Sequence, residues 1–150
     1  MSRPRGRSCR PARRGPWRSR VAEQYGGALT ASPASHPFRI EEHDADGVHV
    51  IAVSGELDLA TAPRLCVLIS AARARGVRRV LVDLSATTFC DSCGLRALIG
   101  EDRELKAHGG RMGVVCPSGE GPVPRLFEMT GAHELLAIRD SADAGLDALA

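Results

Sequence analysis

From residue 38 onwards the chain alternates between short apolar runs, typical of strands, and apolar residues spaced three or four apart, typical of helices. Segments 38–42 and 48–53 predict two strands, with a turn at 44–47 between them. Segment 80–84 is an apolar run bounded by charged residues, so we expect a strand buried on both faces. Two further strands are predicted at 111–116 and 135–138.

Four segments have the apolar spacing of helices. In the first, Thr61 can cap the helix, Pro63 lies in the first turn and Gly76 ends it. The second begins near Asp91 and ends at 109–110, and Asp102 interrupts its apolar stripe. The inward-facing positions of these two helices are predicted to be Leu65, Leu68, Ile69 and Ala72, and Leu95, Leu98, Ile99 and Leu105. The other two span 123–130, with Gly131 as the stop signal, and 140–149, with Leu146 and Leu149 facing inward.

The predicted order of elements is strand, strand, helix, strand, helix, strand, helix, strand, helix. Strands that alternate with crossover helices form parallel pairs, and the helices pack on the sheet. We therefore expect an α/β fold, a single domain with a central mixed sheet that is parallel after the opening hairpin. In such sheets chemistry concentrates at the strand ends, so the segments after each strand are the candidates for a functional site.

Charge divides the chain into two parts. Residues 1–35 carry eight arginines and one acid, a net charge of +7, whereas residues 36–150 carry twelve basic and seventeen acidic residues, a net charge of −5. Repeated Pro and Gly among like charges predict a disordered Arg-rich tail at 1–36, followed by one folded domain at 37–150. The tail can be an arm for nucleic acid or anionic membrane, a dispensable extension or the product of a start assigned too early, and we favour the last two.

Composition excludes several classes of protein. Aromatic residues make up 3% of the chain, so a base-stacking surface for nucleic acid is not expected. The chain contains no run of 18 apolar residues, so we expect no membrane-spanning helix. The five cysteines are an odd number without a secretory signal, which predicts free thiols and a cytoplasmic location. Apolar surroundings place Cys66 and Cys116 in core elements, where a thiol behaves as a small hydrophobe. There is no P-loop, no GxGxxG after a strand and no metal-ligand spacing among the histidines, so we expect no cofactor, no metal and no enzymatic activity.

The junction at residues 81–95 carries the strongest local signal. A buried strand leads through a loop to Asp91 and Ser92 at the start of a helix. The simplest interpretation is an N-terminal cap, which satisfies free amides and needs no function. A second is a redox pair, because Cys90 and Cys93 form a C-x-x-C at a helix start, where a thiolate is stabilised. A zinc half-site is the weakest interpretation, since no second pair of ligands has the required spacing.

Four blocks together resemble the STAS-domain anti-anti-sigma factors, over roughly residues 38–150. The first is V-S-G-E-L-D, ending at Asp58, and the second is V-L-V-D-L at residues 80–84. The third is F-C-D-S-C-G-L at residues 89–95, and the fourth is V-x-x-L-F-x-M-x-G, ending at Gly131. The resemblance implies a STAS fold and a protein that binds an anti-sigma factor with serine kinase activity, which frees a sigma factor for RNA polymerase.

The resemblance also assigns roles to single residues. The kinase would phosphorylate Ser92 and so switch the protein off, and a phosphoserine phosphatase would reverse the modification. The partner-binding residues implied are Asp58, Asp91, Ser92, Cys93 and Gly94, with Asp58 and Asp91 shaping recognition by the kinase and Gly94 allowing close approach of the backbone. The family usually has Ser or Thr where this chain has Cys93. A thiol-redox switch that uses Cys90 and Cys93 is the alternative function.

Overall fold

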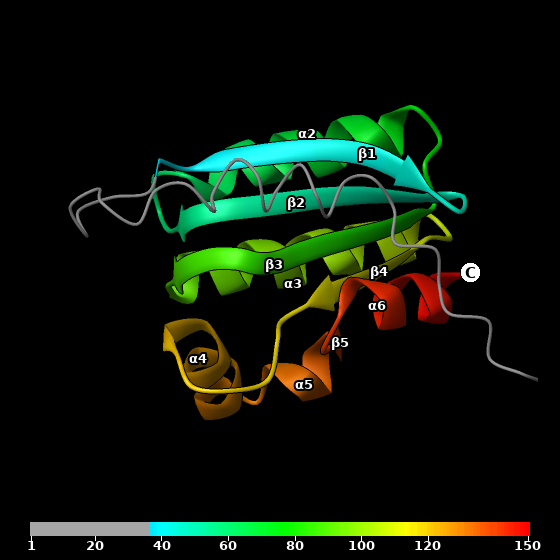
Figure 1. Cartoon of the computed structure of the whole chain (residues 1–150). Helices are drawn as coiled ribbons and strands as arrows, with labels where there is room; N and C mark the ends of the chain where they lie inside the picture. The colour runs from blue at the N-terminus through cyan, green and yellow to red at the C-terminus, as the bar shows by residue number, and fades with distance from the viewer. Residues whose placement is uncertain (1–36) are drawn as a thin grey trace, which may run out of the picture. The chain divides into compact units, whose positions relative to one another are not determined.

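The computed structural model describes residues 37–150, so the predictions made for residues 1–36 lie outside the described part of the chain. Five strands form one sheet in the order β1-β2-β3-β4-β5 (Figure 1). β1 pairs with β2 antiparallel, and every later pair is parallel, as the alternating pattern predicts. The strands are β1 Arg39–Ala45, β2 Val48–Leu57, β3 Arg79–Cys90, β4 Arg111–Val115 and β5 Ala137–Arg139.

Helices follow the strands as crossovers. α2 and α3 lie side by side on one face of the sheet, behind it in Figure 1. α6 packs against β3, β4 and β5. The helices are α2 Ala62–Ala74, α3 Ser92–Ala107, α4 Pro122–Thr130, α5 Ala132–Leu135 and α6 Ala142–Leu149. None of the helices within residues 37–150 is long and apolar enough to cross a membrane.

Residues 80–84 of β3 are buried on both faces, because their side chains alternate between two apolar layers. Val80, Val82 and Leu84 belong to the main core with α2, α3 and α4. Leu81 points the other way, toward α6, where a Cβ added at Gly145 would lie 2.7 Å from its Cδ1 atom. The sequence missed this contact, since it predicted that Leu146 faces inward. Leu146 is only half-buried because α6 approaches the sheet through its small residues.

The first strands are longer than predicted. The turn between β1 and β2 contains only Asp46 and Gly47, and both have positive φ, +52° and +76°. Such a two-residue turn matches the twist of a hairpin, so both strands extend up to it. β2 and β3 also continue past their predicted ends, to Leu57 and Cys90, because two register shifts keep them paired.

The last predicted strand is wrong in position. Residues 132–135 form the short helix α5, in which the Leu136 amide donates to the Ala132 carbonyl over 2.9 Å. The strand that follows begins only at Ala137. Asp102, the polar residue in the apolar stripe of α3, is buried, and one carboxylate oxygen lies 2.7 Å from the Lys106 Nζ atom one turn later.

Candidate functional site

The candidate site lies where β2 and β3 end side by side. Leu57 and Cys90 are the last paired residues of the two parallel strands, and the Asp91 amide donates to the Leu57 carbonyl over 3.2 Å. Asp58 and Asp91 therefore leave neighbouring strands at the same edge of the sheet. The segment from Gly55 to Leu57 is the end of β2.

Asp91 caps α3. Its backbone is extended, with φ −100° and ψ −177°, and its Oδ1 atom accepts from the Gly94 amide over 2.9 Å. The Asp91 carbonyl accepts from the Leu95 amide, which starts the helical hydrogen bonds. This is the geometry of an N-cap, and it makes Ser92 the first residue of the helix.

Gly94 is needed where α3 touches β2. A Cβ added there would lie 2.7 Å from the Leu57 carbonyl oxygen and 2.9 Å from the Cys90 Sγ atom. Both distances are shorter than van der Waals contact, and one of the two atoms belongs to the backbone. The absence of a side chain therefore lets the first turn of α3 lie directly on the end of β2, which is the close approach expected for this glycine.

Ser92 is exposed, and its hydroxyl makes no hydrogen bond within residues 37–150. The amides of Ser92 and Cys93 likewise have no acceptor in the described part of the chain, since only the Gly94 amide is taken by the Asp91 side chain. A helix start with free amides carries partial positive charge and favours an anion. The hydroxyl is thus accessible to a modifying enzyme, and a phosphate on it would meet donors.

Asp58 shapes the turn between β2 and α2. Its Oδ1 atom accepts from the Ala60 and Thr61 amides, at 3.0 and 3.1 Å. Thr61 stands at the cap position of α2, but its hydroxyl makes no capping hydrogen bond, contrary to the prediction. The hydroxyl instead lies 2.7 Å from the Glu56 carbonyl and 2.9 Å from the Asp58 amide. Asp58 and Thr61 together hold the turn beside the start of α3.

Comparisons with known proteins agree with this geometry. A profile of the STAS domain matches residues 39–145. The anti-sigma-B factor antagonist of Staphylococcus aureus is 29% identical over 106 residues, which cover 71% of this chain and 96% of that protein. The chain belongs to the STAS-domain anti-sigma factor antagonist family.

Solved structures support the same assignment. The crystal structure of an anti-sigma factor antagonist from Mycobacterium paratuberculosis is similar with a TM-score of 0.68 and 32% identity, covering 79% of this chain and 97% of that one. The anti-sigma factor antagonist SpoIIAA in its unphosphorylated form has a TM-score of 0.55 and 25% identity, covering 72% and 92% of the two chains. The STAS fold predicted from the four sequence blocks is confirmed.

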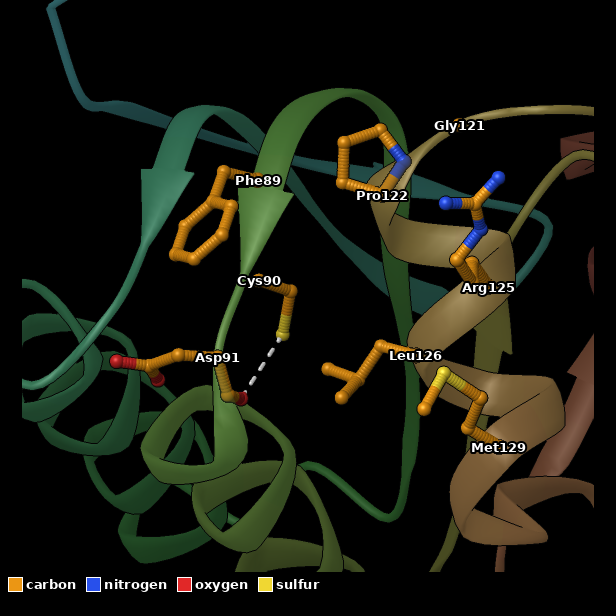
Figure 2. Close-up of a pocket in the computed structure, with 8 residues that line it drawn as sticks. All are labelled: Phe89, Cys90, Asp91, Gly121, Pro122, Arg125, Leu126 and Met129. Atoms are coloured by element: carbon orange, nitrogen blue, oxygen red, sulfur yellow. Dashed lines mark hydrogen bonds between the residues drawn. The ribbon is translucent and has the colours of Figure 1, made fainter.

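In this STAS domain Cys90 is unsuited to redox chemistry. It is the last residue of β3 and is buried, and its thiol donates to the Asp91 carbonyl over 3.5 Å (Figure 2). Burial, and then the negative charge of Asp91 and the nearby Cys116, raise the pKa of the Cys90 thiol to about 12. The helix start was expected to stabilise a thiolate, but burial dominates, so Cys90 stays protonated at neutral pH.

The other cysteines are also free thiols in the described residues. Cys116 is buried as predicted, whereas Cys66 is only half-buried on α2, where burial and the neighbouring Glu101 raise the pKa of its thiol. Cys93 is half-buried on the first turn of α3. Within residues 37–150, no group of three or more His, Cys, Asp or Glu side chains is placed to hold a metal ion.

Sequence reasoning missed the apolar side chains around the site. Leu59 in the β2–α2 turn is 73% exposed, and Phe89, next to the end of β3, is 42% exposed. A signal for Leu59 was present, because an apolar residue directly after Asp58 in a turn has no core to enter. Phe89 carried a weaker signal: it precedes the inward-facing Cys90, so strand alternation turns it outward.

Proposed function

We propose that this chain is an anti-sigma factor antagonist that binds an anti-sigma factor with serine kinase activity and so releases a sigma factor for RNA polymerase. The observation that carries the proposal is the exposed Ser92 hydroxyl at the first turn of α3, between Asp91 and Gly94. The surrounding motif is the one through which the chain resembles its family. Among the structural neighbours, SpoIIAA is an anti-sigma factor antagonist known in an unphosphorylated form.

The surface around Ser92 has the composition of a docking site for a protein. Leu59 and Phe89 expose apolar side chains at the same end of the sheet as Ser92. A contiguous exposed apolar patch with a polar rim marks an interaction surface, and we propose that Leu59 and Phe89 belong to such a patch. Asp58 and Asp91 add acidic groups that are already held in place by backbone amides, so recognition of them requires little reorganisation.

Phosphorylation of Ser92 would turn this surface off without refolding it. A phosphate brings a charge of about −1.5 to −2 at pH 7. The free amides of the helix start accommodate it locally, while Asp91 and Asp58 make the same edge strongly acidic. The added charge then repels acidic groups of a partner and raises the cost of burying this surface against apolar ones. A penalty of ~3 kcal/mol weakens binding roughly a hundredfold, and a phosphoserine phosphatase would restore the binding form.

The test begins with capture of the anti-sigma factor on the immobilised full chain and its identification by mass spectrometry. Titration calorimetry with the purified anti-sigma factor then compares wild type, Ser92→Ala, Ser92→Asp and the phosphorylated chain. We expect Ser92→Ala to bind like wild type, Ser92→Asp to bind more weakly and the phosphorylated chain to bind weakest. The alanine change should lower the free energy of unfolding by less than about 1 kcal/mol, because Asp91 and not Ser92 provides the cap.

A matched control uses another exposed serine. Ser118 lies in the loop after β4, and its hydroxyl donates to Asp140. With the anti-sigma factor and ATP, Ser118→Ala should be labelled once, as the wild type is, and Ser92→Ala should not be labelled. Equal affinities of the alanine, aspartate and phosphorylated forms would refute the switch, and labelling of Ser92→Ala would refute the assigned serine.

A further inference from the structure

A groove of about 530 Å³ lies between the end of β3 and α4 (Figure 2). The thiol of Cys90 and the side chain of Leu126 point toward one another across it. Met129 follows one turn later on α4 and is 79% exposed. The groove is therefore apolar and open to solvent, and its Cys90 wall stays uncharged at neutral pH.

α4 has more apolar surface than the core uses. Val123 and Phe127, four residues apart, are buried in the main core. Leu126 and Met129, three residues apart, form a second apolar row that lines the groove, and Leu126 also packs partly against the core. Met129 is 79% exposed, and together with the exposed side of Leu126 it gives α4 an apolar face for a partner.

Arg125 is the cation that lines the groove. It is exposed, and no acidic side chain in the described part of the chain forms an ion pair with it. The acidic residue in the lining, Asp91, turns its carboxylate away from α4 in Figure 2 and uses it to cap α3. The groove thus combines an apolar wall with one available guanidinium, which complements an apolar side chain next to a carboxylate.

The groove is continuous with the surface proposed to bind the anti-sigma factor. Asp91 belongs both to the groove lining and to the cap that precedes Ser92. We propose that the groove receives an apolar side chain of the anti-sigma factor, and that Arg125 pairs with a carboxylate on the same segment of that partner. The inference rests on the proposed function and adds a second contact, which the Ser92 phosphate does not occupy.

The test measures affinity for the purified anti-sigma factor by titration calorimetry with full-length chains. Met129→Ser and Arg125→Glu should each weaken binding at least tenfold, because each removes one half of the contact. Arg125→Lys should stay within about threefold of wild type, since the charge is kept. Val67→Ser is the matched control: Val67 is 66% exposed on α2, away from the groove, and its loss should leave the affinity unchanged.

Each other outcome is decisive. If Met129→Ser and Arg125→Glu bind like wild type while Ser92→Asp binds weakly, the groove is not a contact and only this inference fails. If the wild-type chain binds no anti-sigma factor, the proposed function fails, and this inference with it. Unchanged partner affinity together with loss of dodecanoate binding in Arg125→Glu would identify a site for a small apolar acid instead. Unchanged partner affinity with altered self-association in sedimentation would identify a second copy as the occupant.

Discussion

At the scale of single residues, two cysteines three positions apart have opposite environments. Cys90 ends a strand inside the core, whereas Cys93 lies half-buried on the first turn of α3. A C-x-x-C motif at a helix start favours a reactive thiolate only if the thiol reaches the amides and the solvent. Burial of Cys90 removes that condition, so the motif lacks the accessible thiolate on which a redox pair depends.

Thiol chemistry tests this directly. With iodoacetamide at pH 8, we expect Cys93 to be alkylated in the native protein and Cys90 to react only after unfolding in urea, because the Cys90 pKa is about 12. Peptide mapping by mass spectrometry measures both sites in one sample. Cys93→Ser should keep both the melting temperature and the affinity for the anti-sigma factor. Alkylation of Cys90 as fast as Cys93 in the folded chain would contradict the burial argument.

At the scale of elements, α3 is positioned by its first turn. Asp91 caps the helix, and the missing side chain of Gly94 brings that turn onto the carbonyl of Leu57. The position of Ser92 relative to the edge of the sheet therefore depends on these two neighbours, which fix the first turn of α3. α4 is held by Val123 and Phe127 and presents its other row toward the groove.

A pair of glycine substitutions in this helix separates packing from helix propensity. Gly94→Ala should lower the free energy of unfolding by about 1–3 kcal/mol, because the new Cβ would overlap the Leu57 carbonyl oxygen. A Cβ added at Gly100, in the same helix, would meet no atom within 4 Å. Gly100→Ala should therefore raise the free energy of unfolding by roughly 0.5–1 kcal/mol. Urea unfolding followed by circular dichroism measures both. If Gly94→Ala left the free energy of unfolding unchanged, α3 would not need this close approach to β2.

At the scale of the whole domain, protonation of His43 links stability to pH. Burial lowers the pKa of His43 below its ordinary value of 6.5, and the charge of His49 lowers it further, against the opposing carboxylates of Asp44, Asp83 and Glu41. The folded state therefore binds a proton less readily than the unfolded state. His43 therefore contributes to the free energy of unfolding above pH 6.5, and this contribution is lost as the pH falls below 6.5.

The pH profile of thermal unfolding checks this contribution. Between pH 8 and pH 5, the melting temperature of the wild type should fall more than that of His43→Gln. His133→Gln is the control, since His133 is exposed on α5 and should keep the wild-type profile. The difference between wild type and His43→Gln isolates His43 from the pair that His49 makes with Glu42 and Asp44. Parallel profiles for wild type and His43→Gln would contradict the prediction.

Local sequence patterns were enough to predict the type and order of almost all elements. Apolar periodicity is a local property, so it identified the strands and the main helices, and the spacing of four motifs identified the family. The cap of α3 by Asp91 and its inward-facing leucines were also predictable, because both depend on residues within one or two turns. α5 was missed because four residues are too few for a periodic signal.

Where these elements end, and which side chains they expose, depends on contacts between segments far apart in the sequence. β2 and β3 reach Leu57 and Cys90 because each strand pairs with the other across more than thirty residues of sequence, and no local pattern encodes that pairing. The same contact buries the Cys90 thiol and raises its pKa to about 12. The outward row of α4 is apolar in sequence, as a core row would be. Only the packing of Phe127 into the core shows that Met129 is left outside.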